Sequence, residues 1–186
     1  MPRVLWAIVI KTTVAHTVSY FIAGLVAFRL FHYAAVLTDP ASGMRPPTHL
    51  MVRAGVLFQP IRGLLFGVVF YLLRDALFGP PLGWLVIWLM LVFVGILSTF
   101  APAPMSIEGF IYNEPTGARR WGGLTEVLSQ SLLLSVVTFY WVNHPEAAWI
   151  SWVLGVLCAL ALALPALGLL AARSTASETP HTPTAT

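Results

Sequence analysis

The chain has 186 residues, of which 58% are hydrophobic and only 9% are charged. A water-soluble domain normally carries about 25% charged residues, so these charges are too few to wet a soluble globule, and we expect an all-α integral membrane protein. The formal net charge of +3 is modest. Because no long basic stretch is interleaved with aromatic residues, we expect no nucleic-acid partner. Cys158 is the single cysteine, which excludes an intrachain disulfide.

The hydrophobic pattern predicts one transmembrane helical bundle over residues 1–173. A helix needs roughly 20 apolar residues to cross about 30 Å of hydrocarbon, and five segments meet or approach that length: 4–30, 63–78, 84–101, 124–142 and 149–172. The second is short, and an alternative start lies near Leu50, with Pro60 kinking the helix. A lysine and a histidine interrupt the first segment, so we expect it to be retained rather than cleaved as a signal peptide. Residues 174–186, rich in Thr, Pro and Ala, are expected to be disordered.

The connections alternate between short and long. Residues 79–83 (GPPLG) and 143–147 (NHPEA) are tight turns, so the helices that flank each turn should form an antiparallel hairpin. Residues 31–62 and 101–121 are much longer than a bare connection needs, and both fall on the same side of a membrane that is crossed five times. In the first, LMVRAGVLFQPIR has the composition of an interfacial helix. In the second, Phe110, Ile111 and Tyr112 are apolar enough to enter the headgroup region or to pack on neighbouring helix ends.

Basic residues gather on the side of these long connections. Arg3, Lys11 and Arg74 fall on the opposite side, while the side of the long connections holds Arg29, Arg45, Arg53, Arg62, Arg119, Arg120 and Arg173. The positive-inside rule places the arginine-rich side in the cytoplasm. We therefore expect a multi-pass protein of the cell membrane, of the bacterial inner-membrane type, with its N-terminus outside and its C-terminus in the cytoplasm.

Polar side chains inside the predicted helices are the first candidates for a site. Thr12, His16 and Tyr20 recur every four residues, so they share one helical face that should point into the bundle. Glu126 and Gln130 lie in the cytoplasmic half of the fourth predicted span. Two interpretations stay open for His16, Tyr20, Glu126 and Gln130. They either hydrogen-bond between helices as packing residues or line a polar cavity or proton path.

The long cytoplasmic connections hold the remaining candidates. Glu108 could serve as an acid or base on a lipid-linked anionic substrate at the inner leaflet. Arg53, Arg62, Arg119 and Arg120 are candidates for contact with anionic headgroups or phosphates. No nucleophile-elbow, zinc-protease or phosphate-loop motif is present. One mid-span histidine is not a ligand set, so we expect neither a metal nor a cofactor.

Three functions fit these features, and the lipid bilayer is the partner common to all. The first is a non-enzymatic accessory or structural subunit, which the lack of catalytic motifs favours. Its small residues would pack within the bundle, against other membrane subunits or against a second copy: Gly63 and Gly67 form a GxxxG pair, and Gly155, Ala159 and Ala163 form a stripe. The second is a small transporter or lipid-binding protein that uses the polar interior. The third is an inner-leaflet lipid-modifying enzyme, which lacks an evident second catalytic group beside the loop carboxylate.

Overall fold

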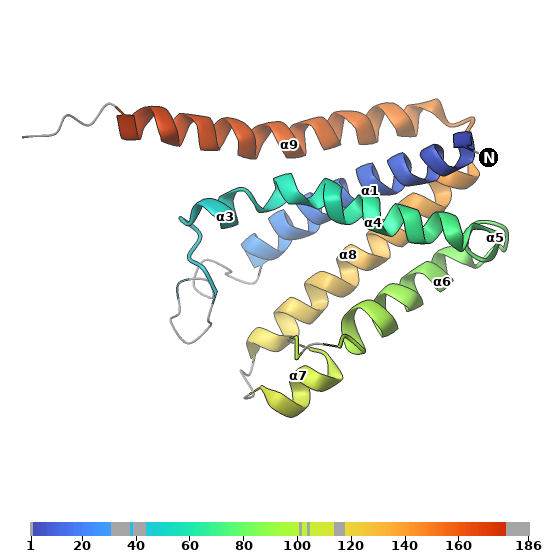
Figure 1. Ribbon diagram of the computed structural model, residues 1–186, viewed down its shortest axis with the longest axis horizontal. Coiled ribbons are helices and arrows are strands. Elements are labelled where there is room, and N and C mark those ends of the chain that lie inside the picture. The colour runs from blue at the N-terminus through green and yellow to red at the C-terminus, as the bar shows by residue number, and fades with distance from the viewer. Residues whose placement is uncertain are drawn as a thin grey trace, which may run out of the picture.

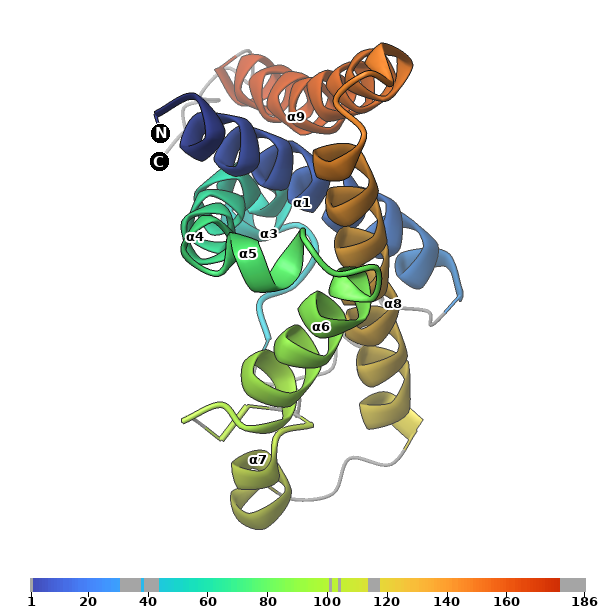
Figure 2. The ribbon, with the colours of Figure 1, turned by 90° about the vertical axis from the view of Figure 1, so that its right-hand side faces the viewer.

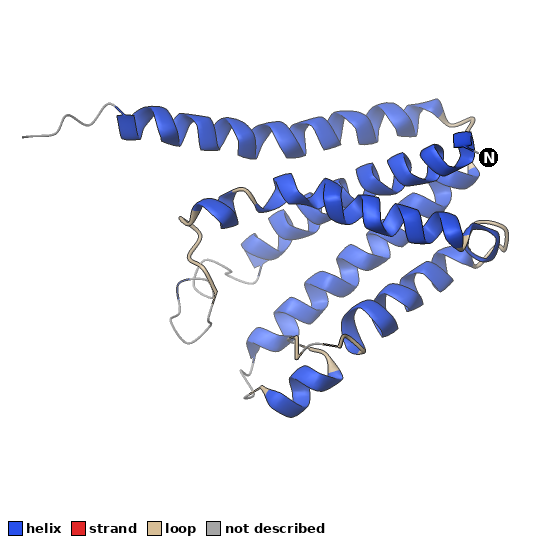
Figure 3. Ribbon diagram, in the orientation of Figure 1, coloured by secondary structure: helices blue, strands red, loops and turns tan. Residues whose placement is uncertain are grey.

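The structure is a computed structural model that describes residues 2–30, 38, 44–100, 102–103, 105–113 and 118–177, without the side chains of 118–122, 173 and 175–177 (Figure 1). Within these residues every regular element is a helix (Figure 3), which confirms the expected all-α fold. Of the two elements labelled η, η2 is a 3-10 helix and η3 is a π-helix. In chain order the elements are α1 (Pro2–Leu30), α3 (Leu50–Arg53), η2 (Gly55–Phe58), α4 (Gln59–Leu72), α5 (Arg74–Leu77), α6 (Gly83–Met90), η3 (Leu91–Leu97), α7 (Ile107–Tyr112), α8 (Ala118–Asn143) and α9 (Ala148–Ser177).

Four helices in the described part of the chain are long and apolar enough to cross a membrane, by length and composition: Pro2–Leu30, Gly55–Leu72, Gly123–Asn143 and Ala148–Ala172. The apolar helix Gly83–Leu97 is shorter. It consists of eight residues of α6 and seven of η3, so it measures about 22 Å at 1.5 Å per residue. The hydrocarbon core is about 30 Å thick, and this helix therefore falls short of a full crossing on length alone.

The second helix starts and ends earlier than the segment 63–78 that hydropathy indicates. It begins with η2 at Gly55 and ends at Leu72, because Leu73 leaves the helical conformation (ψ 11°) before α5 begins. Pro60 stands in the first turn of α4. Proline is tolerated in the first turn of an α-helix, so Pro60 lies where the 3-10 turn η2 passes into α4.

Two further boundaries also differ from the hydropathy pattern. The helix expected over 84–101 ends at Leu97, where Ser98 turns out of the helix (ψ 36°) ahead of the two prolines of the following loop. Residues 174–177, expected to belong to a disordered tail, form the last turn of α9. Residues 178–186, the rest of that tail, lie outside the described residues.

Helix α1 lies at the centre of the bundle. It packs against α4, α8 and α9, while α6 packs against α8; seen from the side in Figure 2, α9, α4 and α8 surround α1. Helices α1, α4, α6, α8 and α9 run in alternating directions, so the N-terminus, α5 and the turn before α9 share one end (Figure 1). The other end, called the α3 end below, carries α3, α7 and the C-terminal end of α9. Buried apolar side chains of α1, α4, α5, α6, η3 and α8 form the main core: Ile8, Ala15, Phe70, Leu77, Ile87, Leu91 and Leu134.

The GxxxG pair of α4 is used inside the chain, against the backbone of α1. A Cβ added to Gly63 would stand 2.7 Å from Thr13 Cα, and one added to Gly67 would stand 2.8 Å from Val9 Cα. Val9 and Thr13 are themselves four residues apart, so one helical turn of α4 meets one helical turn of α1 directly. Glycine permits this approach because it has no Cβ. This pair is therefore covered and is not a surface for a second copy.

Helix α7 stands on a loop that side-chain hydrogen bonds hold in place. The Ser106 hydroxyl accepts from the Gly109 N–H at 2.9 Å and donates to the Ala103 carbonyl at 2.8 Å. A Cβ on Gly109 would overlap that carbonyl, so glycine is required here. On this support α7 leaves Phe110 77% and Tyr112 71% exposed. Packing on neighbouring helix ends would have covered both rings, so that alternative is wrong for Phe110 and Tyr112.

Candidate functional site

One face of α1 carries polar side chains into the bundle. Thr12 and His16 are 0% and 1% exposed, and Tyr20 is half-buried one turn further on. The His16 and Tyr20 rings lie 6.5 Å apart between centroids. The four-residue spacing read from the sequence therefore produces a polar row that runs from the centre of α1 towards the α3 end.

His16 is held by Gln59 at the start of α4. The Gln59 side-chain N–H donates to the Gly55 carbonyl at 3.1 Å, so its oxygen faces His16. His16 Nε2 then donates to Gln59 Oε1 at 3.2 Å, which places the proton of the neutral ring on Nε2. The Phe66 ring meets the imidazole edge-on at 5.1 Å between centroids.

Sequence reasoning missed Gln59 because that residue precedes the apolar segment assigned to the second span. A usable signal was present: Gln59, Gly63 and Gly67 recur every four residues and so share one face of α4. The same face meets α1, since a Cβ on Gly63 would stand 3.2 Å from His16 Cβ. Close helix packing thus brings the amide to the imidazole.

Three buried side-chain polar atoms have no hydrogen-bond partner among the described residues. They are Thr12 Oγ1 and His16 Nδ1 on α1 and Thr138 Oγ1 on α8. Other buried hydroxyls on these helices bond to the preceding turn, as Thr17 does to the Thr13 carbonyl at 2.9 Å. Buried polar groups are rarely left unpaired, so the unpaired atoms of Thr12 and His16, two of these three, distinguish the polar row of α1 within the described interior.

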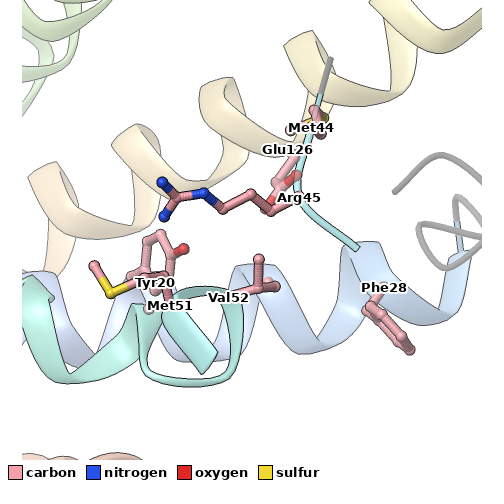
Figure 4. A pocket seen from close by; sticks show the side chains of 9 residues that line it. Tyr20, Phe28, Met44, Arg45, Met51, Val52 and Glu126 are labelled. Carbon is pink, nitrogen blue, oxygen red and sulfur yellow. The ribbon is translucent and has the colours of Figure 1, made fainter. Parts of the chain in front are cut away.

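At the α3 end the polar row opens into a pocket of about 500 Å³ (Figure 4). Its wall is formed by helices α1, α3, η2 and α8 and by the segment before α3. The lining residues are Tyr20, Gly24, Phe28, Met44, Arg45, Met51, Val52, Gly55 and Glu126. Pockets of this size commonly bind small molecules. The structure thereby brings together two residues that the sequence singles out, Tyr20 and Glu126, on the wall of one cavity.

Charges of both signs act at this pocket. Figure 4 shows Arg45 extending across it, with the Tyr20 hydroxyl and Glu126 on the wall. Arg62 lies 5.5 Å from the centre of the Phe66 ring, a cation–π distance. Phe66 contacts the His16 ring, so Arg62 lies beside the polar row.

The other residues singled out by the sequence lie apart from the pocket wall. Gln130 is half-buried on α8, and the amide that pairs with His16 is Gln59. Glu108 is half-buried in the first turn of α7. Arg53 donates to the Gly168 carbonyl of α9 at 2.9 Å. The side chains of Arg119 and Arg120 lie outside the described residues, although their backbone belongs to α8.

Lys11 caps the end of α8, at the opposite end of the bundle. Pro145 follows α8 and has no N–H, so the Trp141 carbonyl lacks the donor that the fourth residue along a helix usually supplies. Lys11 Nζ donates to this carbonyl at 2.7 Å. A cation at a helix C-terminus is also favoured by the helix dipole, which gives Lys11 a structural role.

Within the described residues, no three histidine, cysteine, aspartate or glutamate side chains gather as metal ligands would. The site that stands out is therefore the polar row of α1 with the pocket into which it opens. Comparison with protein-family models, with curated proteins and with solved structures gave no match, so the function has to be inferred from the chemistry of this site.

Proposed function

We propose that the chain is a cell-membrane protein that crosses the bilayer five times and binds an amphiphilic lipid in the pocket at the α3 end. The observation that carries the proposal is the composition of the pocket wall. Phe28, Met44 and Met51 offer apolar surface, and Arg45 and Glu126 supply charge beside it. A ligand that satisfies both parts has an apolar and a polar portion. Methionine side chains adapt to irregular apolar ligands.

The arrangement of the helices supports the five crossings. The alternating directions of α1, α4, α6, α8 and α9 put the N-terminus and the C-terminal end of α9 at opposite ends of the bundle (Figure 1), which is the arrangement that an odd number of crossings requires. The shortfall of the helix Gly83–Leu97 is compatible with a crossing, because local thinning of the bilayer costs only fractions of a kcal/mol per Å of mismatch. The arginine distribution favours a cytoplasmic α3 end, with the N-terminus outside.

The topology and the binding are tested separately. Reporter fusions at the two chain ends should be found on opposite sides of the membrane; the same side for both would refute five crossings. For binding, lipids that stay with the purified protein are measured by native mass spectrometry. Gly24→Leu should reduce this retention, because Gly24 lines the pocket and a Cβ there meets no atom within 4 Å.

Gly155→Leu is the matched control for the pocket variant. Gly155 also lies in a helix, a Cβ there meets no atom within 4 Å, and it faces outward on α9. The same substitution should therefore leave lipid retention unchanged. Equal retention by wild type and both variants would show that the pocket does not hold the lipid.

A second candidate function, that of an accessory subunit, is favoured by the outer face of α9. Gly155, Ala159 and Ala163 form a small-residue stripe that this chain leaves exposed, in contrast to the covered GxxxG pair of α4. Small residues allow another transmembrane helix to approach closely. Extraction from native membranes in mild detergent should then yield a complex. Substituting Ala159 with Leu should release the partner, while a monomeric wild type would contradict this role.

A further inference from the structure

We infer that the pocket selects a zwitterionic phospholipid, whose phosphate binds Arg45 and whose ammonium group binds Glu126. The inference rests on the proposed function, since it names the class of lipid for the same pocket. It starts from the charges of the wall. Among the described residues that line the pocket, Arg45 is the one cation and Glu126 the one anion, with the Tyr20 hydroxyl as a further polar group.

The two charges come from different parts of the chain. Arg45 belongs to the segment before α3 and Glu126 belongs to α8, and both line the pocket (Figure 4). Among the described residues Arg45 forms no ion pair. Arg45 is an exposed residue, and its guanidinium is well suited to a phosphate, which it can bind through two parallel N–H donors.

The pair of charges discriminates between classes of lipid headgroup. A purely anionic headgroup would gain Arg45 but would place its charge next to the Glu126 carboxylate. A headgroup with a single positive charge would meet the opposite conflict at Arg45. A headgroup that carries a phosphate and an ammonium group satisfies both residues, and the Tyr20 hydroxyl can accept a hydrogen bond from the ammonium. Like charges brought together at a binding site are a strong source of selectivity.

The remaining wall decides in favour of a lipid over a soluble molecule with the same headgroup. Phe28, Met44, Met51 and Val52 add apolar surface to the wall of the same pocket. A free amino-phosphate would leave this surface without a partner. Acyl chains would cover it, and the pocket lies at an end of the bundle where a lipid can enter from one leaflet.

The experiment uses the full chain in detergent micelles. Phosphatidylethanolamine, phosphatidylglycerol and free phosphoethanolamine are added in turn, and binding is measured by native mass spectrometry and by the shift in thermal midpoint. Wild type should bind the zwitterionic lipid at least about tenfold more tightly than the anionic one. Glu126→Gln should remove most of this preference, because the carboxylate that repels the anionic headgroup is gone. Arg45→Gln should weaken both lipids.

Arg74→Gln and Asp75→Asn are the matched controls. Both residues lie at the opposite end of the bundle, so neutralising either one should leave the lipid preference unchanged. Arg45 is exposed and outside the helices, so Arg45→Gln tests the inference even if Glu126→Gln fails to fold.

The outcomes separate the two proposals. If neither lipid binds, the proposed function itself fails. If both lipids bind equally well to wild type, or if Glu126→Gln keeps the full preference, the pocket binds lipid but the zwitterionic selection is wrong. If free phosphoethanolamine competes as well as the lipid does, the headgroup chemistry belongs to a soluble ligand and the phospholipid is overturned.

Discussion

Replacing both Gly63 and Gly67 with alanine should force α4 away from α1. The added Cβ atoms would stand 2.7 Å from Thr13 Cα and 2.8 Å from Val9 Cα, and each would also stand 3.0 Å from the backbone carbonyl oxygen of the same residue. Non-bonded carbon atoms are most stable at about 3.5–4.0 Å, so the helices would have to separate by about 1 Å. The obstructing atoms are backbone, which cannot move aside as a side-chain end can.

The size of the effect follows from two opposing contributions. Overpacking of this kind costs about 1–3 kcal/mol per site, while replacing glycine by alanine in a helix returns up to about 1 kcal/mol. The double variant should therefore lose about 2 kcal/mol in free energy of unfolding. The matched double variant Gly24→Ala with Gly155→Ala adds the same atoms where no atom lies within 4 Å. It should gain up to about 2 kcal/mol by the same helix propensity.

Equilibrium unfolding in mixed detergent micelles, followed by far-ultraviolet circular dichroism, measures both double variants against wild type. The two should differ by about 4 kcal/mol, the difference between the loss and the gain derived above. Equal stability of the two double variants would refute the close approach of α1 and α4. Size-exclusion chromatography adds a second criterion. If the Gly63 and Gly67 changes converted a dimer into a stable monomer, these glycines would lie between chains rather than within one.

Three further predictions concern single side chains. Gln59→Leu should destabilise the fold by about 1–3 kcal/mol, because it leaves the buried Nε2–H of His16 without an acceptor. Thr138→Val should leave the free energy of unfolding unchanged or raise it, since the replaced hydroxyl has no partner among the described residues. The same unfolding assay measures the Gln59 and Thr138 variants. A lower stability of Thr138→Val would contradict the prediction and reveal a partner of the hydroxyl. The pKa of Glu146 lies below its ordinary 4.5 because the carboxylate accepts from its own backbone N–H and from His144. The native state thus favours the ionised form, and this contribution is present above pH 4.5 and is lost as the pH falls through the lower native pKa. Glu146→Gln should therefore flatten the thermal-midpoint profile below about pH 4.5, and an unchanged profile would contradict this assignment.

The sequence by itself determined the class of the protein and the distribution of its charges. Whether a segment is apolar enough for lipid depends on that segment alone, so α1, α8 and α9 could be read from composition. The end of the bundle at which the arginines gather followed from the alternating directions expected for successive apolar helices. Helix ends were less predictable: Leu73 and Ser98 leave the helical conformation inside apolar sequence, where hydropathy gives no signal to stop.

Tertiary structure decided which polar groups meet. His16 and Gln59 are 43 residues apart, and they pair because glycines let α4 lie against the α1 backbone at that level. The GxxxG pair of α4 and the small-residue stripe of α9 look alike in the sequence, but the structure covers the first with α1 and leaves the second exposed. Arg45 joins Tyr20 and Glu126 at the pocket only because the chain before α3 folds across the end of the bundle. The periodicity of a single segment cannot predict this contact, because the contact depends on the positions of three separate segments in the folded chain.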